Sequence, residues 1–466
     1  MNKEQTFHSP SWTNSAIAYQ IFPDRFYRPE NAGSRSDICL WGGIPDRDNF
    51  FGGTLNGIIE KLDYLQALGV NLLYLTPIFK AETNHRYDTV NYYEIDPLLG
   101  TKEDFSKLVD ALHKRNMRII LDGVFNHTSD RYPAFADVCR NGQNSEFADW
   151  YFINDYPVTS KPVNYQTCGG CEYLPKLNTA NTDVRKEIFN IARYWIREFH
   201  IDGWRLDCAS KISKDFWKEF YSEVKQENPE AYVVAEIWRE TGPWLNRGLF
   251  DGVMNYRLRD ILLEYIVSNH LDAEDFSYEL LSLKEEHGEA IHAMLNLVGS
   301  HDVERIMTGC GGDWNKVYLL YALLMTLPGI PMIYYGDEIG LPGGNDPDCR
   351  RCMIWDQNGW NSALFNRIRS LTDLRSNHSA LQTGYFRVVY TFNGLLVFER
   401  KNSEEQILII LNSRKEERNI RIPVDRIKWN NLLTQKIQKG NDGFICLEKV
   451  AANSFQILSA ELKNSG

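Results

Sequence analysis

The sequence contains no apolar run long enough to cross a membrane, which takes about 18 or more consecutive apolar residues. Basic residues are also in the minority, because 51 Lys and Arg stand against 62 Asp and Glu and give a formal net charge of -11. A chain with this charge repels phosphate backbones, so we do not expect a nucleic acid as partner. Because a long apolar run is lacking, we do not expect a membrane as partner either. Residues 1–14 are polar and lack an apolar signal core. We therefore expect a cytoplasmic protein.

Cysteines are few for a chain of 466 residues, and their number, nine, is odd. This usage is typical of a reducing compartment rather than of a disulfide framework. Two CxxC spacings, Cys168/Cys171 and Cys349/Cys352, match the ligand spacing of zinc sites. The two pairs lie far apart in the sequence, and neither has the context of a zinc ribbon. We interpret them as free loop thiols and expect no metal.

Short apolar runs recur through the first 380 or so residues and are typical of buried parallel strands. Between them lie amphipathic helical stretches. Apolar residues fall at helical spacing in Asp183–Phe199, where Asn181 or Thr182 can cap the helix, and in Leu55–Leu68. Eight strand–helix units predict an α/β fold, a (β/α)8 TIM barrel, with strands at Ile17–Phe22, Asn71–Leu75, Arg118–Asp122, Gly203–Asp207, Tyr232–Glu236, Gly252–Met254, Ala293–Leu297 and Pro331–Tyr335.

Two parts of the chain depart from this alternation. The connection after the third strand, residues 127–178, is unusually long and has no clean helix, which predicts an inserted lid subdomain over the site. Residues 381–466 instead predict a C-terminal antiparallel β-sandwich. The barrel itself then comprises residues 1–126 and 179–380. The strands expected in the sandwich are Tyr385–Tyr390, Leu395–Arg400, Gln406–Asn412 and Glu417–Pro423.

Charged and imidazole side chains recur where four of the predicted barrel strands end, and strand ends are where a barrel carries its reactive groups. A structural ion pair is the usual explanation of one such residue. Four groups that meet at one mouth of a barrel are hard to explain in that way. The residues are Asp122, Asn126 and His127 after the third strand, Arg205 and Asp207 at the fourth, Glu236 and Trp238 at the fifth, and His301 and Asp302 at the seventh.

Two carboxylates are sufficient to cleave a glycosidic bond, because one attacks the anomeric carbon while the other protonates the leaving oxygen and then activates water. Retaining enzymes need about 5–5.5 Å between the two groups, and neighbouring strands lie about 4.8 Å apart. Asp207 and Glu236 end consecutive strands and are therefore a candidate nucleophile and general acid/base. We expect Arg205 to keep Asp207 ionised. We expect the less polar neighbours of Glu236, Ile237 and Trp238, to keep it protonated.

The four strand-end segments resemble the motifs of glycoside hydrolase family 13, the α-amylase family. The resemblance covers essentially the whole chain, and the motifs occur in the family's order. It implies that Asp207 is the nucleophile, Glu236 the acid/base and Asp302 the transition-state stabiliser. His301 and His127 are expected to hydrogen-bond the sugar hydroxyls. The segments are DGVFNH (122–127), GWRLDCAS (203–210), EIW (236–238) and VGSHD (298–302).

A fifth segment, LPKLN at 174–178, is similar to a signature of neopullulanases, cyclomaltodextrinases and maltogenic amylases. This resemblance implies that Tyr87 stacks on the sugar beside the scissile bond, and that Asp346 and Arg350 bind the next glucose toward the non-reducing end. Arg205 and Trp238 complete the expected substrate-binding set. The implied activity is hydrolysis of α-1,4 and, in some members, α-1,6 bonds of maltooligosaccharides, cyclodextrins, pullulan or starch. Further similar stretches are 50–65, 75–79, 84–89, 194–207 and 334–353.

Three features depart from that subfamily. Its usual N-terminal β-domain is missing ahead of Ala16, which favours a monomer and a more open cleft. Ser210 and Lys211 stand where an Asn-Glu pair is frequent on the acceptor side, so the balance between the two bond types and between hydrolysis and transfer stays open. Thr54 stands where calcium-binding members supply an Asp, and a neutral hydroxyl is a weak calcium ligand. We therefore expect no cofactor and interpret Asn126 as a hydrogen-bonding residue of the lid.

Two alternative functions remain. A 4-α-glucanotransferase would use the same three carboxylates and pass the glucosyl group to a sugar instead of water. A non-catalytic glycan-binding barrel belongs to another class of protein. The intact set of Asp207, Glu236, Asp302 and Arg205 disfavours this second alternative.

Overall fold

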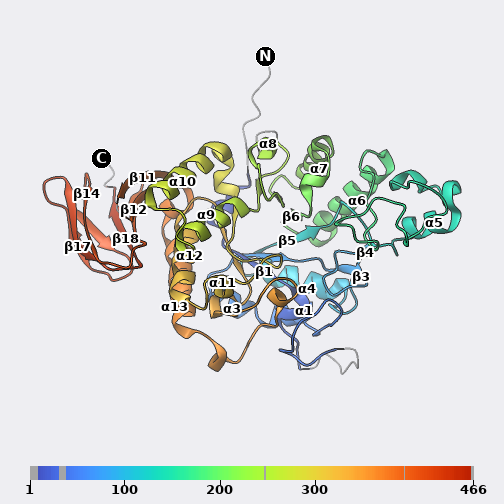
Figure 1. Cartoon of the computed structure of the whole chain (residues 1–466), viewed down its shortest axis with the longest axis horizontal. Coiled ribbons are helices and arrows are strands. Elements are labelled where there is room, and N and C mark those ends of the chain that lie inside the picture. The colour runs from blue at the N-terminus through green and yellow to red at the C-terminus, as the bar shows by residue number, and fades with distance from the viewer. Residues whose placement is uncertain (1–8, 31–37, 246–247, 393, 463–466) are drawn as a thin grey trace, which may run out of the picture.

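The computed structural model describes residues 9–30, 38–245, 248–392 and 394–462. Of the polar stretch 1–14, the first eight residues lie outside this part. A barrel occupies the middle of the molecule, the C-terminal sheets lie at one end, and the insertion that contains α5 lies at the opposite end (Figure 1). In the described part of the chain, no helix is both long enough and apolar enough to span a bilayer.

Eight parallel strands form one sheet in the order β8-β7-β6-β5-β2-β1-β10-β9. A parallel bridge between Met254 and Leu295 joins its two ends and closes the barrel. Each strand lies within or overlaps one of the eight predicted runs, so the predicted barrel is confirmed. The strands are β1 (Ala18–Ile21), β2 (Leu72–Leu75), β5 (Arg118–Gly123), β6 (Gly203–Leu206), β7 (Tyr232–Ala235), β8 (Gly252–Val253), β9 (Leu295–Asn296) and β10 (Ile330–Tyr334).

Alternate residues of the barrel strands belong to two separate apolar cores, because successive side chains of a strand point to opposite faces. Leu72 and Tyr74 of β2 pack in the barrel interior. Leu73 and Leu75 face outward and pack against the surrounding helices. All four side chains are fully buried. Burial on both faces explains why these strands are continuous apolar runs in the sequence.

The two helices predicted by range are present, but a break at Lys61 divides the stretch predicted as one helix over Leu55–Leu68. Helix α6 begins at Thr182, and the Asn181 side chain caps it. The helices are α1 (Pro23–Phe26), α2 (Leu55–Glu60), α3 (Leu62–Ala67), α4 (Lys102–His113), α5 (Pro133–Asn141), α6 (Thr182–Phe199), α7 (Lys214–Glu227), α8 (Gly242–Leu245), α9 (Tyr256–Ile266), α10 (Ala273–His287), α11 (Ile306–Gly309), α12 (Trp314–Thr326), α13 (Ser362–Asn377) and α14 (Ser379–Thr383).

The insertion after β5 contains a helix, although the sequence pattern predicted no clean helix there. Helix α5 has Pro133 at its first position, where a missing N–H costs nothing, and it buries Phe135 and Val138. Isolated bridges such as His127 with Lys176 tie the end of the insertion back to its beginning. A further unpredicted feature, an antiparallel pair formed by β3 (Phe79–Ala81) and β4 (Thr89–Ile95), follows β2.

The C-terminal sheets are antiparallel, as predicted for a sandwich. A six-stranded sheet in the order β11-β12-β13-β18-β15-β16 packs against the pair β14-β17 through a separate apolar core. The four predicted strands are confirmed as β11 to β14, whereas four more after residue 423 went unpredicted. The strands are β11 (Tyr385–Phe392), β12 (Leu395–Lys401), β13 (Glu405–Asn412), β14 (Arg418–Pro423), β15 (Lys428–Asn431), β16 (Ile437–Lys439), β17 (Phe444–Val450) and β18 (Ser454–Glu461).

Candidate active site

A fully buried guanidinium, that of Arg205, lies at the centre of the carboxyl ends of β5, β6 and β7. Strand register explains this, because β5 pairs Asp122 with Arg205, and β6 and β7 end side by side. Asp207 and Glu236 follow directly after β6 and β7. Arg205 therefore contacts four carboxylates, at 2.8 Å from Asp122, 3.0 Å from Asp207, 3.1 Å from Glu236 and 4.0 Å from Asp302.

Asp207 and Glu236 face each other closely, because a carboxylate oxygen of one lies within 4.8 Å of an oxygen of the other. Two further donors hold Glu236. Its Oε2 accepts from the backbone N–H of Cys208 at 2.8 Å, and its Oε1 accepts from the Trp238 indole at 3.0 Å. Cys208 has a left-handed backbone with φ of 46°, a strained conformation typical of functional sites.

Burial and the nearby Glu236 raise the pKa of Asp207 to about 7, and Arg205 lowers it only in part. The predicted contact between Arg205 and Asp207 is present. The expectation that Arg205 keeps Asp207 ionised stays a prediction, and the guanidinium shares its single charge with Asp122 and Glu236. Two carboxylates this close oppose each other's ionisation, so the pair retains one proton to an unusually high pH.

Tyr87 and His301 lie side by side with their rings nearly parallel, at 4° and 5.6 Å between centroids. The Tyr87 hydroxyl donates to Asp122 at 2.9 Å. Burial, together with the charges of Arg350 and Arg205, holds the pKa of His301 well below its ordinary value, so the ring is neutral.

The hydrogen bonds around His301 define its tautomer. Nδ1 accepts from the Gln20 amide at 2.8 Å, so Nε2 carries the hydrogen and donates to the Tyr87 hydroxyl at 2.5 Å, while Asp302 lies 3.3 Å from Nε2. His127 lies on the other side of Tyr87, with its Nε2 3.1 Å from the Tyr87 carbonyl oxygen. The site thus presents hydrogen-bonding groups from several strand ends toward one region.

Asp302 is linked to the predicted outer pair Asp346 and Arg350. Arg350 forms an ion pair with Asp346 at 2.9 Å and lies 3.7 Å from Asp302. Its Nε also donates to the His301 carbonyl at 3.0 Å. Burial raises the pKa of Asp302, and the two guanidiniums of Arg205 and Arg350 oppose that shift. All ten residues predicted for the site therefore lie in one connected cluster.

A family model, that of the alpha-amylase catalytic domain, matches residues 20–383. The chain belongs to the α-amylase family. It is 42% identical to a cyclomaltodextrinase of Geobacillus thermopakistaniensis over 93% of this chain and 75% of that protein. It is 40% identical to a maltogenic alpha-amylase of Bacillus acidopullulyticus, over 98% and 79% of the two chains. A solved structure, the cyclic alpha-maltosyl-(1→6)-maltose hydrolase of Arthrobacter globiformis, superposes with a TM-score of 0.89 at 40% identity and covers 98% of this chain and 100% of that one.

The sequence did not predict two hydrogen bonds and one aromatic stack in the site of this α-amylase family member. The Tyr74 hydroxyl donates to Asp122 at 2.7 Å, and Gln20 fixes His301. Both residues lie inside otherwise apolar strands. A polar group in such a run indicates a polar contact in the barrel interior, so the sequence offered a signal for these two. Tyr256 stacks on Trp238 with 3.7 Å between ring centroids. No sequence signal pairs these two rings, since they belong to different βα units.

Thr54 and Asn126 differ in how well they suit calcium. The Thr54 hydroxyl accepts from the N–H of Gly57 at 3.0 Å and so caps α2, which leaves it engaged with backbone. The Asn126 amide nitrogen lies 3.3 Å from the imidazole of His127. The Asn126 side-chain oxygen is buried and has no hydrogen-bond partner among the described residues, and oxygen is the ligand that calcium binds.

The two CxxC pairs do not form a common cluster among the described residues. Cys168 is partly exposed, while Cys349 is buried and donates to the His301 carbonyl at 3.3 Å. In the part of the chain that the structure describes, one group of His, Cys, Asp or Glu side chains is close enough to share a metal ion. It consists of Asp207, Cys208 and Glu236, so it includes the candidate catalytic pair itself.

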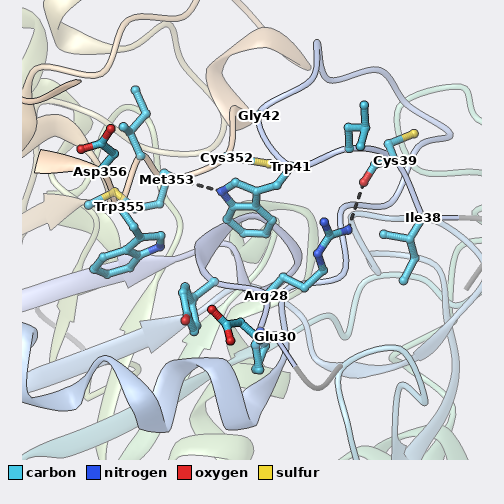
Figure 2. Close-up of a pocket in the computed structure, with 14 residues that line it drawn as sticks. Arg28, Glu30, Ile38, Cys39, Trp41, Gly42, Cys352, Met353, Trp355 and Asp356 are labelled. Atoms are coloured by element: carbon cyan, nitrogen blue, oxygen red, sulfur yellow. Dashed lines mark hydrogen bonds between the residues drawn. The ribbon is translucent and has the colours of Figure 1, made fainter. Parts of the chain in front are cut away.

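A pocket of about 830 Å3 lies beside the loop after α1, outside the carboxylate cluster. Figure 2 shows the Trp41 indole pointing to Met353, whose carbonyl it contacts at 3.0 Å. The Trp355 indole donates to the Phe26 carbonyl at 2.6 Å. Both indoles are thus engaged with backbone, and they hold this loop against the segment that follows Arg350. The lining of the pocket shares no residue with the predicted site.

Proposed function

We propose that this chain is a retaining hydrolase of α-glucans, with Asp207 as nucleophile and Glu236 as general acid/base. One observation carries the proposal, the approach of the two carboxylates to within 4.8 Å. Inverting glycosidases separate their carboxyl groups by about 6.5–9.5 Å to hold a water between them. A gap this narrow supports direct attack by the carboxylate, which is the retaining mechanism.

The reaction takes two steps that share one proton. Glu236 gives its proton to the glycosidic oxygen while an Asp207 oxygen bonds to the anomeric carbon and the bond to the leaving sugar breaks. Glu236 then takes a proton from a water whose oxygen bonds to the same carbon, and the bond to Asp207 breaks. The pair retains one proton near neutral pH, in accord with the raised pKa of Asp207. With that proton on Glu236, Asp207 is free to attack.

The surrounding groups hold the sugar during these steps. Asp302 and the neutral His301 lie together and are suited to bind ring hydroxyls as positive charge develops on the anomeric carbon. Tyr87 presents an aromatic ring next to them, and a sugar face packs well on such a ring. Arg350 and Asp346 form the next polar pair outward. We assign these residues to substrate binding and Asp302 to stabilisation of the transition state.

The substrate class we propose is short or cyclic α-glucans, with α-1,4 bonds and α-1,6 bonds as alternatives. The names of the relatives support it, because they include a cyclomaltodextrinase, a maltogenic alpha-amylase and a hydrolase of a cyclic maltosyl-maltose with a (1→6) link. Rates on β-cyclodextrin, pullulan and soluble starch, measured side by side with products identified, rank these substrates. With maltotriose, early accumulation of longer oligomers would indicate transfer to sugar instead of hydrolysis.

The variant Glu236→Gln tests the assigned role. Loss of the acid is expected to lower the rate on maltooligosaccharides by a factor of about 10²–10⁴. The matched control is Glu240→Gln, four residues further on and exposed, which is expected to keep the wild-type rate. Proton NMR of the first product measures the stereochemistry, and retention predicts the α-anomer. A full rate in Glu236→Gln, or a β-anomer as the first product, contradicts the proposal.

A further inference from the structure

The pocket beside the loop after α1 is a cavity that the hydrolysis proposed above does not use. Its volume of about 830 Å3 falls within the range of about 300–1,000 Å3 that is usual for ligand pockets. One wall comes from residues 27–30 and 38–42, which follow β1, and the other from residues 352–356, which follow β10. Because β1 and β10 are neighbours in the barrel, the pocket lies at the carboxyl end of the barrel, as the carboxylate cluster does.

We propose that this pocket is a second binding site for an α-glucan chain, with the Trp41 indole as the platform for one sugar ring. Aromatic rings and charged side chains line one space, among them Trp41, Trp355 and Arg28 (Figure 2). Aromatic faces beside hydrogen-bonding groups suit a sugar ring, which has an apolar face and a polar edge. The inference rests on the proposed function for the identity of the sugar, and only for that.

The Trp41 ring is held in place but is not covered. Its N–H donates to the Met353 carbonyl at 3.0 Å. Trp355 packs against the ring of Phe26 at 5.1 Å and the ammonium of Lys61 at 4.6 Å, whereas no ring or cation of the described residues lies over Trp41 in this way. At the next position, Gly42, an added Cβ would meet nothing within 4 Å. An indole that is fixed in advance and open to one side loses little conformational entropy when a ligand packs on it.

The charges of the described residues in and beside the pocket balance one another. Arg28 and Lys61 are cationic, whereas Glu30 and Asp356 are anionic and exposed. The Lys61 ammonium lies 3.7 Å from the centroid of the Tyr27 ring, so that aromatic ring already has a cation. The pocket therefore favours neither a free anion nor a free cation. A neutral ligand with an apolar face and hydroxyl groups at its edge fits it better.

The exposed carboxylate of Asp356 can take part in binding such hydroxyls. Its Oδ1 accepts from the backbone N–H of Asn358 at 3.0 Å and from the Asn358 amide at 2.9 Å. Both bonds go to the same oxygen, which fixes the carboxylate and leaves Oδ2 available to a ligand. Carboxylates only accept hydrogen bonds when ionised, and a sugar hydroxyl is a donor for them.

The pocket shares a segment of chain with the proposed cleft. Residues 352–356 begin two positions after Arg350, which we assigned to substrate binding. Arg25 ties the two together, because its carbonyl accepts from the Met353 N–H at 2.8 Å and its guanidinium donates to the Arg350 carbonyl at 3.3 Å. A long glucan held in the pocket keeps its other glucose units near the cleft and raises their effective concentration. Short substrates gain nothing in this way.

Native gel electrophoresis, with and without soluble starch in the gel, measures this binding. All variants carry Glu236→Gln, so that cleavage of the starch is slowed. Trp41→Ala should weaken starch binding by about 10-fold, a typical loss for a central aromatic contact. Trp41→Phe keeps an aromatic ring and should retain most of the affinity. The matched control is Tyr278→Ala, which removes an aromatic side chain of α10 that is 73% exposed and lies outside the pocket, and it should bind starch as its parent does.

Equal retardation of Trp41→Ala and its parent would overturn the inference, because the cleft alone would then hold the starch. An equal loss in Trp41→Phe would also overturn it and would point to the bond with Met353 instead of the ring. The rate on maltotriose, measured with Glu236 intact, reports on the segment that carries Arg350. A fall in this rate as large as the loss of starch affinity would mean that Trp41→Ala acts through that segment, again against the inference.

Failure of the proposed function gives a different result. If the chain cleaves no α-glucan while Trp41→Ala still loses starch binding, the catalytic assignment fails and the second site stands. If the chain cleaves maltotriose while the Trp41 variants and their parent bind starch alike, the second site fails and the catalytic assignment stands.

Discussion

Arg205 sets the charge balance of the site at the scale of single residues. Its one positive charge faces four carboxylates, and each of them gains less than it would from a partner of its own. Burial then decides the protonation of the cluster. Asp207, the proposed nucleophile, is held where burial and the charge of Glu236 raise its pKa and so oppose its ionisation, which lowers the stability of the folded protein at high pH.

Asp207→Asn is expected to stabilise the folded protein at and above neutral pH. An unfolded Asp ionises near pH 4, whereas the folded pair of Asp207 and Glu236 keeps its one shared proton until about pH 7. Between these values the folded state binds more protons, so wild-type stability falls as the pH rises through this window and stays lower above it. Asn has no proton to lose. Urea unfolding at pH 8 should show a gain of about 1–2 kcal/mol, the usual size for one stabilising change.

The gain should shrink when the same variants are unfolded at pH 4, where Asp207 is protonated in the folded state. Asp373→Asn, at an exposed position of α13, is the control and should change stability at neither pH. Equal stability of Asp207→Asn and wild type at pH 8 would mean that the carboxylate is not destabilised by its surroundings. Activity of Asp207→Asn should be lost under all conditions.

Helix α6 shows how one element positions the site. It leads directly into β6, which carries Arg205 and precedes Asp207. Its amphipathic pattern packs Trp195 and Ile188 into the main core. The Asn181 side chain accepts hydrogen bonds from the N–H groups of Asp183 at 2.8 Å and Val184 at 3.2 Å. These contacts satisfy donors that have no partner within the helix.

Asn181→Ala removes this cap and is expected to lower the free energy of unfolding by about 1 kcal/mol. Asn181→Asp keeps an acceptor oxygen at the same place and should retain most of the stability. Both variants should keep the wild-type kcat well below the unfolding transition, because the half-buried Asn181 lies outside the carboxylate cluster. Urea denaturation measures the first effect, and a steady-state assay the second. A loss shared equally by Ala and Asp would point to packing rather than to the cap.

At the scale of the whole molecule, a buried arginine connects the barrel with the C-terminal sheets. Arg400 of β12 donates to the Thr326 carbonyl at the end of α12 at 2.7 Å, and to Gly384 at 3.0 Å. Arg375 of α13 bonds to carbonyls on the same side, including Gly329. Burial lowers the pKa of Arg375 to about 9. The two parts thus share buried polar contacts that neither can satisfy alone.

Arg400→Met is expected to lower the free energy of unfolding by about 2–4 kcal/mol, because it leaves buried carbonyls without a donor. The unfolding transition should also broaden or split, since the link between barrel and sheets is weakened. Arg421→Met, at an exposed position of β14, is the control. Calorimetry and urea unfolding measure both effects. A change below about 0.5 kcal/mol, the size of an ordinary surface substitution, would refute the role of Arg400.

Local patterns in the chain were enough to predict the barrel and its reactive edge. Apolar runs locate the strands, and in a parallel barrel the residues just after each strand meet at one end. Asp207, Glu236 and Asp302 were therefore found without coordinates. Patterning worked less well where the signal was short or mixed, as in α5 and in the four strands after residue 423. The monomeric state stays a prediction.

Long-range contacts and burial were decided by the tertiary structure alone. Gln20 and His301 share a hydrogen bond although they are 281 residues apart. The raised pKa of Asp207 likewise depends on burial and on how many carboxylates share Arg205. Periodicity reports which face of a strand or helix is buried. It carries no information about which distant side chain shares a site, or about the charge density that results when several strands end together.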